Sequence, residues 1–316
     1  MLAFDTVLDP NARRFIEMVD QLGIRGWRTR YSFYPNDKYK ALIQTDRSRG
    51  MQIYWKEILA RAHLASATAI LRSTQWIEGM RVATTAGNLL SFAACFRGLI
   101  ESAADSSSAL KLVALSLARD HGYVVQALTG QLKSQTFLAP ELEETLIHYA
   151  YARHLTKAEL LAAPLTHKAL KVRDYIDLLV QGKVTDVAPC YQALCDLTHP
   201  GATSVWMWLR PDNDHAMHIQ ADQDNAIIRD FLAEWTTTFS ELLMFAFNPA
   251  LATLRVLNYF PLTSWHTPAL DKWEMSGIPL WKKCGEQLKG VRPRTQGRLS
   301  IVKPTPRNVT PRKQRG

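Results

Sequence analysis

The chain has 316 residues, of which 47% are hydrophobic and 21% are charged, and its formal net charge is +9. This length and composition are typical of a globular protein of one large or two ordinary domains, and they exclude a chain that is disordered throughout. Residues 1–14 lack the basic start and apolar run of a signal peptide, and no uncharged stretch reaches membrane-spanning length. We therefore expect a soluble, cytoplasmic protein with no membrane partner.

The first fifty residues predict an N-terminal arm rather than a domain. Apolar residues at positions 15, 16, 19 and 22 share one face of a short amphipathic helix, which Gly23 ends. Residues 25–37 then mix arginines with aromatic residues, glycine and proline, and show no regular period. This irregular stretch is expected to lie along the surface of the domain that follows.

Residues 51–260 predict a helical bundle. Apolar residues recur at helical spacing, and Gly122 and Pro164 are expected to end two of the helices. Asp105 and the three serines after it are expected to interrupt another. The pattern predicts helices over residues 49–71, 85–121, 140–161, 166–180, 186–198 and 222–247.

One stretch within this region predicts a β-hairpin. The segments 205–209 and 215–219 flank the turn-rich pentapeptide 210–214. Because an isolated hairpin is marginally stable in water, it should pack on the helices through Trp206 and Trp208. The fold class expected is therefore all-α: an antiparallel helical bundle with one small inserted β-hairpin and a disordered basic C-terminal tail.

The positive charge is concentrated at the C-terminal end. Residues 282–316 hold eleven Lys or Arg and one acid, whereas residues 1–281 hold 27 basic and 28 acidic residues. Residues 261–316 are expected to form an extended tail that attracts a polyanion, and nucleic acid (RNA or DNA) is the commonest one inside cells. A linker without a partner and a segment for acidic lipid are the alternatives. The candidate nucleic-acid-binding residues are Arg292, Arg294, Arg298, Lys303, Arg307, Arg312, Lys313 and Arg315.

Two segments place ionisable side chains within apolar helical patterns. Arg97 and Glu101 are four residues apart on one helix, and Tyr191 lies on a second helix that ends at His199. Buried ionisable groups need partners, so we expect Arg97, Glu101 and His199 to lie within hydrogen-bonding reach. A structural network, a catalytic site and a metal site that adds Asp105 or Asp196 are all open at this point.

The sequence lacks the usual signatures of cofactor chemistry. The four cysteines, at positions 95, 190, 195 and 284, have no Cys-x-x-Cys spacing, and no glycine-rich phosphate loop or dinucleotide fingerprint is present. We expect no disulfide framework, no resident metal and no cofactor, with three of the cysteines packed in the core.

The Arg-x-x-x-Glu at residues 97–101 and the Tyr-x-x-Leu-x-x-x-x-His-Pro at residues 191–200, in this order, resemble HEPN-type helical domains over about residues 88–247. The resemblance implies an antiparallel helical bundle, often a homodimer, with a role in phage defence or as a toxin. Many such proteins cut RNA through an Arg-x(4 to 6)-His motif. One match exists, Arg210 to His215, but it spans the predicted hairpin turn, whereas the family's motif belongs to a helix.

These observations predict a HEPN-like protein that associates with nucleic acid through its basic tail, in bacterial defence or stress response. The first alternative is a metal-independent ribonuclease or toxin. In it, Arg97 holds a phosphate, Glu101 orients His199 as the proton shuttle, and Tyr191 belongs to the same site. The second alternative is a non-catalytic dimeric interaction scaffold.

Overall fold

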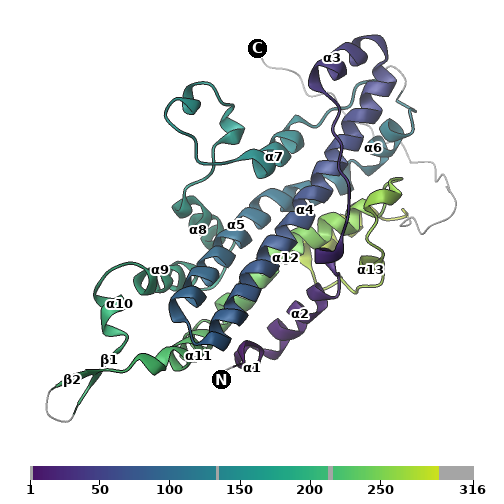
Figure 1. Cartoon of the computed structure of the whole chain (residues 1–316). Coiled ribbons are helices and arrows are strands. Elements are labelled where there is room, and N and C mark those ends of the chain that lie inside the picture. The colour runs from purple at the N-terminus through teal and green to yellow at the C-terminus, as the bar shows by residue number, and fades with distance from the viewer. Residues whose placement is uncertain (1–2, 133–134, 213–215, 292–316) are drawn as a thin grey trace.

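Three long helices form the centre of the molecule. The structure is a computed structural model that describes residues 3–132, 135–212 and 216–291. Helices α4 (Arg47–Ala86), α5 (Leu89–Arg119) and α12 (Thr236–Leu257) lie side by side and make the most extensive contacts with one another (Figure 1). In the described part of the chain, strands occur in one antiparallel pair, β1 (Leu209–Pro211) with β2 (Met217–Ile219). The predicted all-α fold with one small β-hairpin is confirmed.

Helix α4 is the longest element. Its 40 residues span about 60 Å at the usual rise per residue. The side chain of Asp46 caps its first turn by accepting a hydrogen bond from the backbone of Arg49. Gly87 ends the helix in the left-handed conformation, with a φ of 62°, and Asn88 then caps α5. This tight turn makes α4 and α5 antiparallel neighbours.

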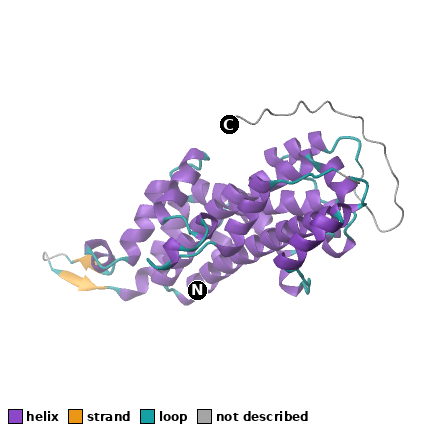
Figure 2. Cartoon of the chain, turned by 90° about the horizontal axis from the view of Figure 1, so that it is seen from above, coloured by secondary structure: helices purple, strands orange, loops and turns teal. Residues whose placement is uncertain are grey.

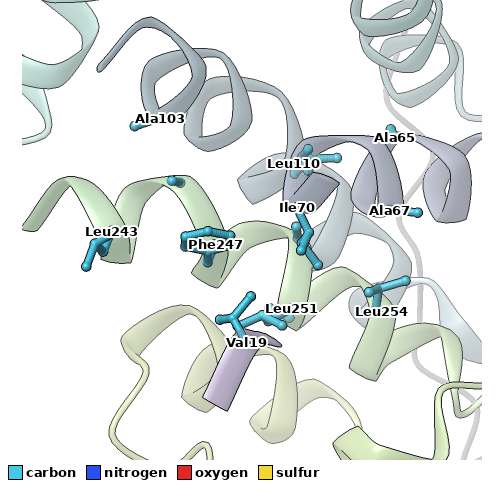
Figure 3. Packing of buried hydrophobic residues seen from close by; sticks show 14 of the residues in the cluster. Val19, Ala65, Ala67, Ile70, Ala103, Leu110, Leu243, Phe247, Leu251 and Leu254 are labelled. Atoms are coloured by element: carbon cyan, nitrogen blue, oxygen red, sulfur yellow. The ribbon is translucent and has the colours of Figure 1, made fainter. Parts of the chain in front are cut away.

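Small side chains let the central helices approach closely. Ala65 and Ala67 of α4 and Ala103 of α5 belong to the same buried cluster as Phe247 and Leu251 of α12. Figure 3 shows such residues meeting between the helices. The alanines reduce the separation of the helix axes, and the larger residues fill the space that remains.

Shorter helices surround this centre. Contacts place α7, α8 and α9 along α5, α1 and α2 against α4 and α12, and α3 and α6 against α4. Seen from above, the molecule is elongated and the hairpin lies at one end (Figure 2). The bounds of the shorter helices are α1 Phe4–Val7, α2 Pro10–Asp20, α3 Asn36–Thr45, α6 His121–Leu128, α7 Pro140–Tyr151, α8 Val172–Gln181, α9 Val187–Thr198, α10 Ala202–Trp206, α11 Asp224–Glu234, α13 Pro268–Asp271 and α14 Pro279–Gln287.

Several expected helix limits were wrong. Helix α5 continues through Asp105 because the hydroxyl of Ser106 donates to the carbonyl of Ala246 on α12, which satisfies the serine inside the helix contact. Gly122 does not end a helix but lies within α6. Helix α7 ends at Tyr151, ten residues before the expected limit, and only short 3-10 turns follow it before α8. The single helix expected over residues 222–247 is two helices, α11 and α12, separated at Trp235.

The hairpin is shorter than expected. Residues 202–206 are helical, so the first strand begins only at Leu209. Trp208 fixes the hairpin to the body, because its indole N–H donates to the carboxylate of Asp224, which also accepts from the backbone of Leu89. Trp206, expected to pack on the helices, is 56% exposed.

Both ends of the described chain contribute to the core. Ile16 and Val19 of α2 are buried, so the first helices belong to the folded body rather than to an arm. The extended tail expected from residue 261 begins later, because α13 and α14 fold onto the body and bury Leu270 and Cys284. Of the four free cysteines, Cys190 and Cys284 are buried and the other two are partly exposed. The expected disorder beyond residue 291 falls outside the described residues, and so do all eight candidate nucleic-acid-binding residues of the tail.

No helix in the described segments is both long enough and apolar enough to span a membrane.

A matched pair of glycine substitutions tests the packing of α5 on α4. A Cβ on Gly98 would lie 2.5 Å from the indole ring of Trp76, which a hydrogen bond to Ser102 holds in place. We expect Gly98→Ala to lower the free energy of unfolding by about 1–3 kcal/mol through overpacking. Gly122→Ala, where nothing lies within 4 Å, should instead raise it by about 0.5–1 kcal/mol. Urea unfolding followed by circular dichroism measures both, and a Gly98→Ala variant as stable as the wild type would contradict this packing.

Candidate functional site

Arg97, Glu101 and Tyr191 form the polar network that the sequence predicts. Arg97 and Glu101 lie on the face of α5 that α9 covers, and Tyr191 and Thr198 come from α9. Arg97 donates to the hydroxyl of Thr198 at 2.9 Å and to that of Tyr191 at 3.2 Å. The Tyr191 hydroxyl in turn donates to Oε1 of Glu101 at 2.8 Å. Tyr191 therefore links the two charges, which share it as a common partner.

The network is half-buried: Tyr191 is buried, whereas Arg97, Glu101 and Thr198 are partly exposed and hydrogen-bond within it. The guanidinium carbon of Arg97 lies 5.3 Å from the centre of the Tyr191 ring, and Nε of Arg97 is buried without a hydrogen-bond partner among the described residues. Burial raises the pKa of Tyr191 to about 12, although Arg97 opposes the shift. A neutral tyrosine thus bridges the two ionised groups across the neutral pH range.

His199 does not join this network. Helix α9 ends at Thr198, and the backbone of His199 is extended, so its exposed side chain leaves the helix rather than continuing the buried face. Its backbone N–H donates to Cys195, but its ring makes no hydrogen bond or ion pair with any residue in the described ranges. The expected convergence therefore holds for Arg97 and Glu101, through Tyr191, and was wrong for His199.

The structure does not form the candidate metal site, and it does not describe the complete Arg-to-His motif. Asp105 pairs with Arg72 of α4, and over the described residues no group of three His, Cys, Asp or Glu side chains could hold a metal ion. Arg210 donates to the backbone carbonyls of Met207 and Leu209 within the start of the hairpin. His215, its partner in the only Arg-to-His spacing, lies outside the described residues.

A second group of charged side chains lies on the surface, in the segment before α4. Residues 25–49 hold seven basic and two acidic residues, whereas residues 50–281 hold 18 basic and 22 acidic residues. All seven basic side chains are exposed. Segment 25–49 is therefore the positively charged part of a body that is otherwise slightly acidic.

Five of these cations have no carboxylate partner. Arg81 and Arg153, elsewhere on the surface, pair with acidic side chains. No ion pair with any described residue is made by Arg25, Arg28, Arg30, Lys38 or Lys40. Their charge is available to an anion from solution.

Exposed aromatic rings lie beside these cations. Phe33, Tyr34 and Tyr151 are 37%, 41% and 49% exposed. The guanidinium carbon of Arg61 lies 4.3 Å from the centre of the Phe33 ring and 6.0 Å from that of Tyr151, so Arg61 connects the segment with the end of α7. Tyr151 also stacks on His167. We name residues 25–49 together with Arg61 and Tyr151 the arm surface.

Contacts with α4 hold the arm surface in place. The Tyr31 hydroxyl lies 2.6 Å from Nδ1 of His63, and the backbone N–H of Tyr34 donates to the carboxylate of Glu57. In Figure 1 the segment runs alongside α4 before it turns into α3. Glu143 and Glu57 both raise the pKa of Tyr39, after the larger effect of burial. The arm is thus a fixed surface whose cations outnumber the neighbouring acids.

Only part of the arm surface could be recognised from the sequence. The mixture of arginines and aromatic residues after Gly23 is visible in the sequence, but without a regular period it predicts only an irregular arm. Arg61 and Tyr151 could not be assigned to it, because they come from distant segments that only the fold brings to Phe33.

Comparison of the chain with protein-family models, with curated proteins and with solved structures finds no match. The resemblance to HEPN-type domains therefore stays a prediction.

Removing one hydroxyl tests whether the half-buried network is structural. Tyr191→Phe leaves Arg97 with one partner fewer and Glu101 without its hydrogen-bond donor, so we expect the free energy of unfolding to fall by about 1–3 kcal/mol. Tyr151→Phe, at an exposed position, should change it by less than about 0.5 kcal/mol. Chemical denaturation at neutral pH measures both, and equal stabilities would contradict the structural role.

The Tyr191 hydroxyl also makes the stability of the protein depend on pH. The pKa of Tyr191 is raised from 10.0 to about 12 in the folded protein, so its contribution to stability is complete below pH 10 and is lost as the pH rises toward 12. Other buried tyrosines add to this alkaline loss. Tyr191→Phe should lose less stability between these pH values than the wild type does, in melting temperatures measured across the range.

Proposed function

We propose that this chain binds single-stranded nucleic acid on the arm surface. The observation that supports it best is that segment 25–49 presents five exposed cations without an ion pair among the described residues together with the exposed rings of Phe33 and Tyr34, and that Arg61 links Phe33 to the exposed ring of Tyr151. Proteins that bind single strands without sequence preference combine a positively charged track for the phosphates with aromatic side chains on which the bases stack. Arg61, held over Phe33, adds a planar cation that can stack on a base as well.

The basic tail adds to this surface in the proposal. The eight basic residues of segment 292–316 would contribute salt-dependent, sequence-independent attraction, while the arm surface would supply the stacking contacts. This division keeps the nucleic-acid partner predicted from the sequence and moves its principal site to the folded part of the chain. The HEPN-like identity, and with it a role in bacterial defence or stress response, is part of the same proposal.

The ribonuclease hypothesis gains no support from the half-buried network. Arg97 and Glu101 are already hydrogen-bonded to Tyr191, and Glu101 does not contact the ring of His199. A site for phosphate transfer needs a proton shuttle beside the reacting atoms. Likewise, no observation on the described surface favours a dimeric scaffold over the nucleic-acid partner.

Charge-matched variants test the proposal. Arg30→Ala/Lys38→Ala/Lys40→Ala removes three cations from the arm surface, and Lys111→Ala/Arg173→Ala/Arg229→Ala removes three exposed cations from other helices. We expect the first variant to bind a fluorescent single-stranded RNA 20-mer at least about ten times more weakly. Its slope of log affinity against log salt should fall by about two. The second variant should stay close to the wild type in anisotropy titrations over a salt series.

Two results would contradict this placement. If both triple variants bound RNA equally weakly, affinity would depend on net charge alone and not on the position of the cations. The absence of any binding by the full-length wild type would refute the proposed function itself.

Deleting residues 292–316 separates the tail from the arm surface. The last described helix ends at Gln287, so we expect the melting temperature of the truncated chain to change little. Binding of the same RNA should weaken and its salt dependence should flatten, but measurable binding should persist. Complete loss of binding in the truncated chain would assign the interaction to the tail alone.

A further inference from the structure

A pocket lies where the arm begins. Three segments line it: Trp27, Arg28 and Thr29 of the arm, His63 of α4, and Ser264, His266 and Thr267 of the segment that leads into α13. Its volume is about 380 Å³. The three contributing segments are far apart in the sequence, so only the folded chain forms this pocket.

The lining is rich in hydrogen-bond donors and contains no carboxylate. It combines a guanidinium, two imidazoles and three hydroxyl groups with the indole of Trp27. Arg28 is exposed, makes no ion pair with a described residue, and spends only Nη1 on the backbone carbonyls of Arg25 and Trp27. Such a lining favours an anion over a cation or a neutral ligand.

The ring of His266 is held by the carboxylate of Asp271. Its Nε2 lies 2.8 Å from Oδ2 of Asp271, and Oδ1 of Asp271 accepts from Asn258 and lies 3.5 Å from Arg255. The Asp271 carboxylate is therefore already partnered by Asn258 and Arg255 as well as by His266. This arrangement leaves Nδ1 of His266 for a ligand, as donor or acceptor according to its protonation.

His63 is a rigid, neutral part of the same pocket. Its ring is stacked on Trp27 at a centroid distance of 5.6 Å, and the Tyr31 hydroxyl occupies Nδ1. Burial lowers its pKa to about 4, so it carries no charge at neutral pH. Nε2 is the ring nitrogen left for another partner.

We propose that this pocket binds the terminal phosphate of a nucleic-acid strand that lies on the arm surface, an inference that rests on the proposed function. Trp27, Arg28 and Thr29 of the lining come directly before Arg30, Phe33 and Tyr34 of the arm surface along the chain. A terminal phosphomonoester presents three non-bridging oxygens to the surrounding donors, whereas a phosphodiester within a strand presents two. The pocket therefore distinguishes a strand end from its interior.

The test compares strands that differ only at their ends. Full-length protein is titrated with a labelled RNA 12-mer that carries a 5′-phosphate, a 3′-phosphate or neither, with uridine monophosphate as a competitor. We expect one of the two terminal phosphates to tighten binding about ten-fold, as charge-assisted hydrogen bonds would. Arg28→Gln and His266→Gln should each abolish that preference while the strand without a terminal phosphate still binds.

Arg25→Gln is the matched control, because Arg25 is exposed on the same arm but does not line the pocket. It should weaken all three strands by the same factor and keep the preference. If it abolishes the preference as Arg28→Gln does, or if the wild type binds all three strands within two-fold, the pocket proposal is wrong while the proposed function stands. Binding of uridine monophosphate without any strand binding would assign the pocket to a free nucleotide, overturning both the strand-end site and the proposed function.

Discussion

The packing of α4 against α5 and α12 is the contact on which the rest of the structure depends. This forty-residue helix supplies the alanine-rich face of the core, and its half-buried Glu57 and Arg61 and its buried His63 contact the arm and fix it. Because the interior is close-packed, the helix cannot bend or rotate without disturbing both the core and the arm. An irregular segment without regular hydrogen bonds of its own thus acquires a defined shape from the rigid helix beneath it.

Charged residues serve two different purposes in this molecule. Along α5, Arg97, Glu101 and Asp105 bond to tyrosine, threonine and arginine side chains of the helices packed against them, although Nε of Arg97 has no partner among the described residues. Buried polar groups are costly unless they are paired, and these charges are consequently unavailable to a ligand. On the arm the reverse holds, because Arg25, Arg28, Arg30, Lys38 and Lys40 are exposed and make no ion pair with any described residue. The charges of α5 stand in a conspicuous motif but are paired, whereas those of the arm are exposed. The arm charges therefore support a functional proposal and the α5 charges do not.

The helical class and the meeting of Arg97, Glu101 and Tyr191 could be predicted because they follow from spacing within and between amphipathic helices. The position of the His199 ring could not, since it depends on the direction of the extended backbone that follows the helix end at Thr198. The serines after Asp105 looked like an interruption because their hydrogen-bond partner, the carbonyl of Ala246, comes from a helix 140 residues away. The pocket around His63 and His266 combines three distant segments, and no local pattern in the sequence connects them.

Photo-crosslinking tests the central claim, that single-stranded nucleic acid lies on the arm surface, most directly. Full-length protein would be irradiated with a 4-thiouridine-labelled single-stranded RNA, and the attached peptides would be identified by mass spectrometry. The account predicts adducts at Phe33, Tyr34 or Tyr151, which an excess of unlabelled RNA suppresses. Adducts confined to residues 292–316, or to the end of α10 at the exposed Trp206, would contradict it.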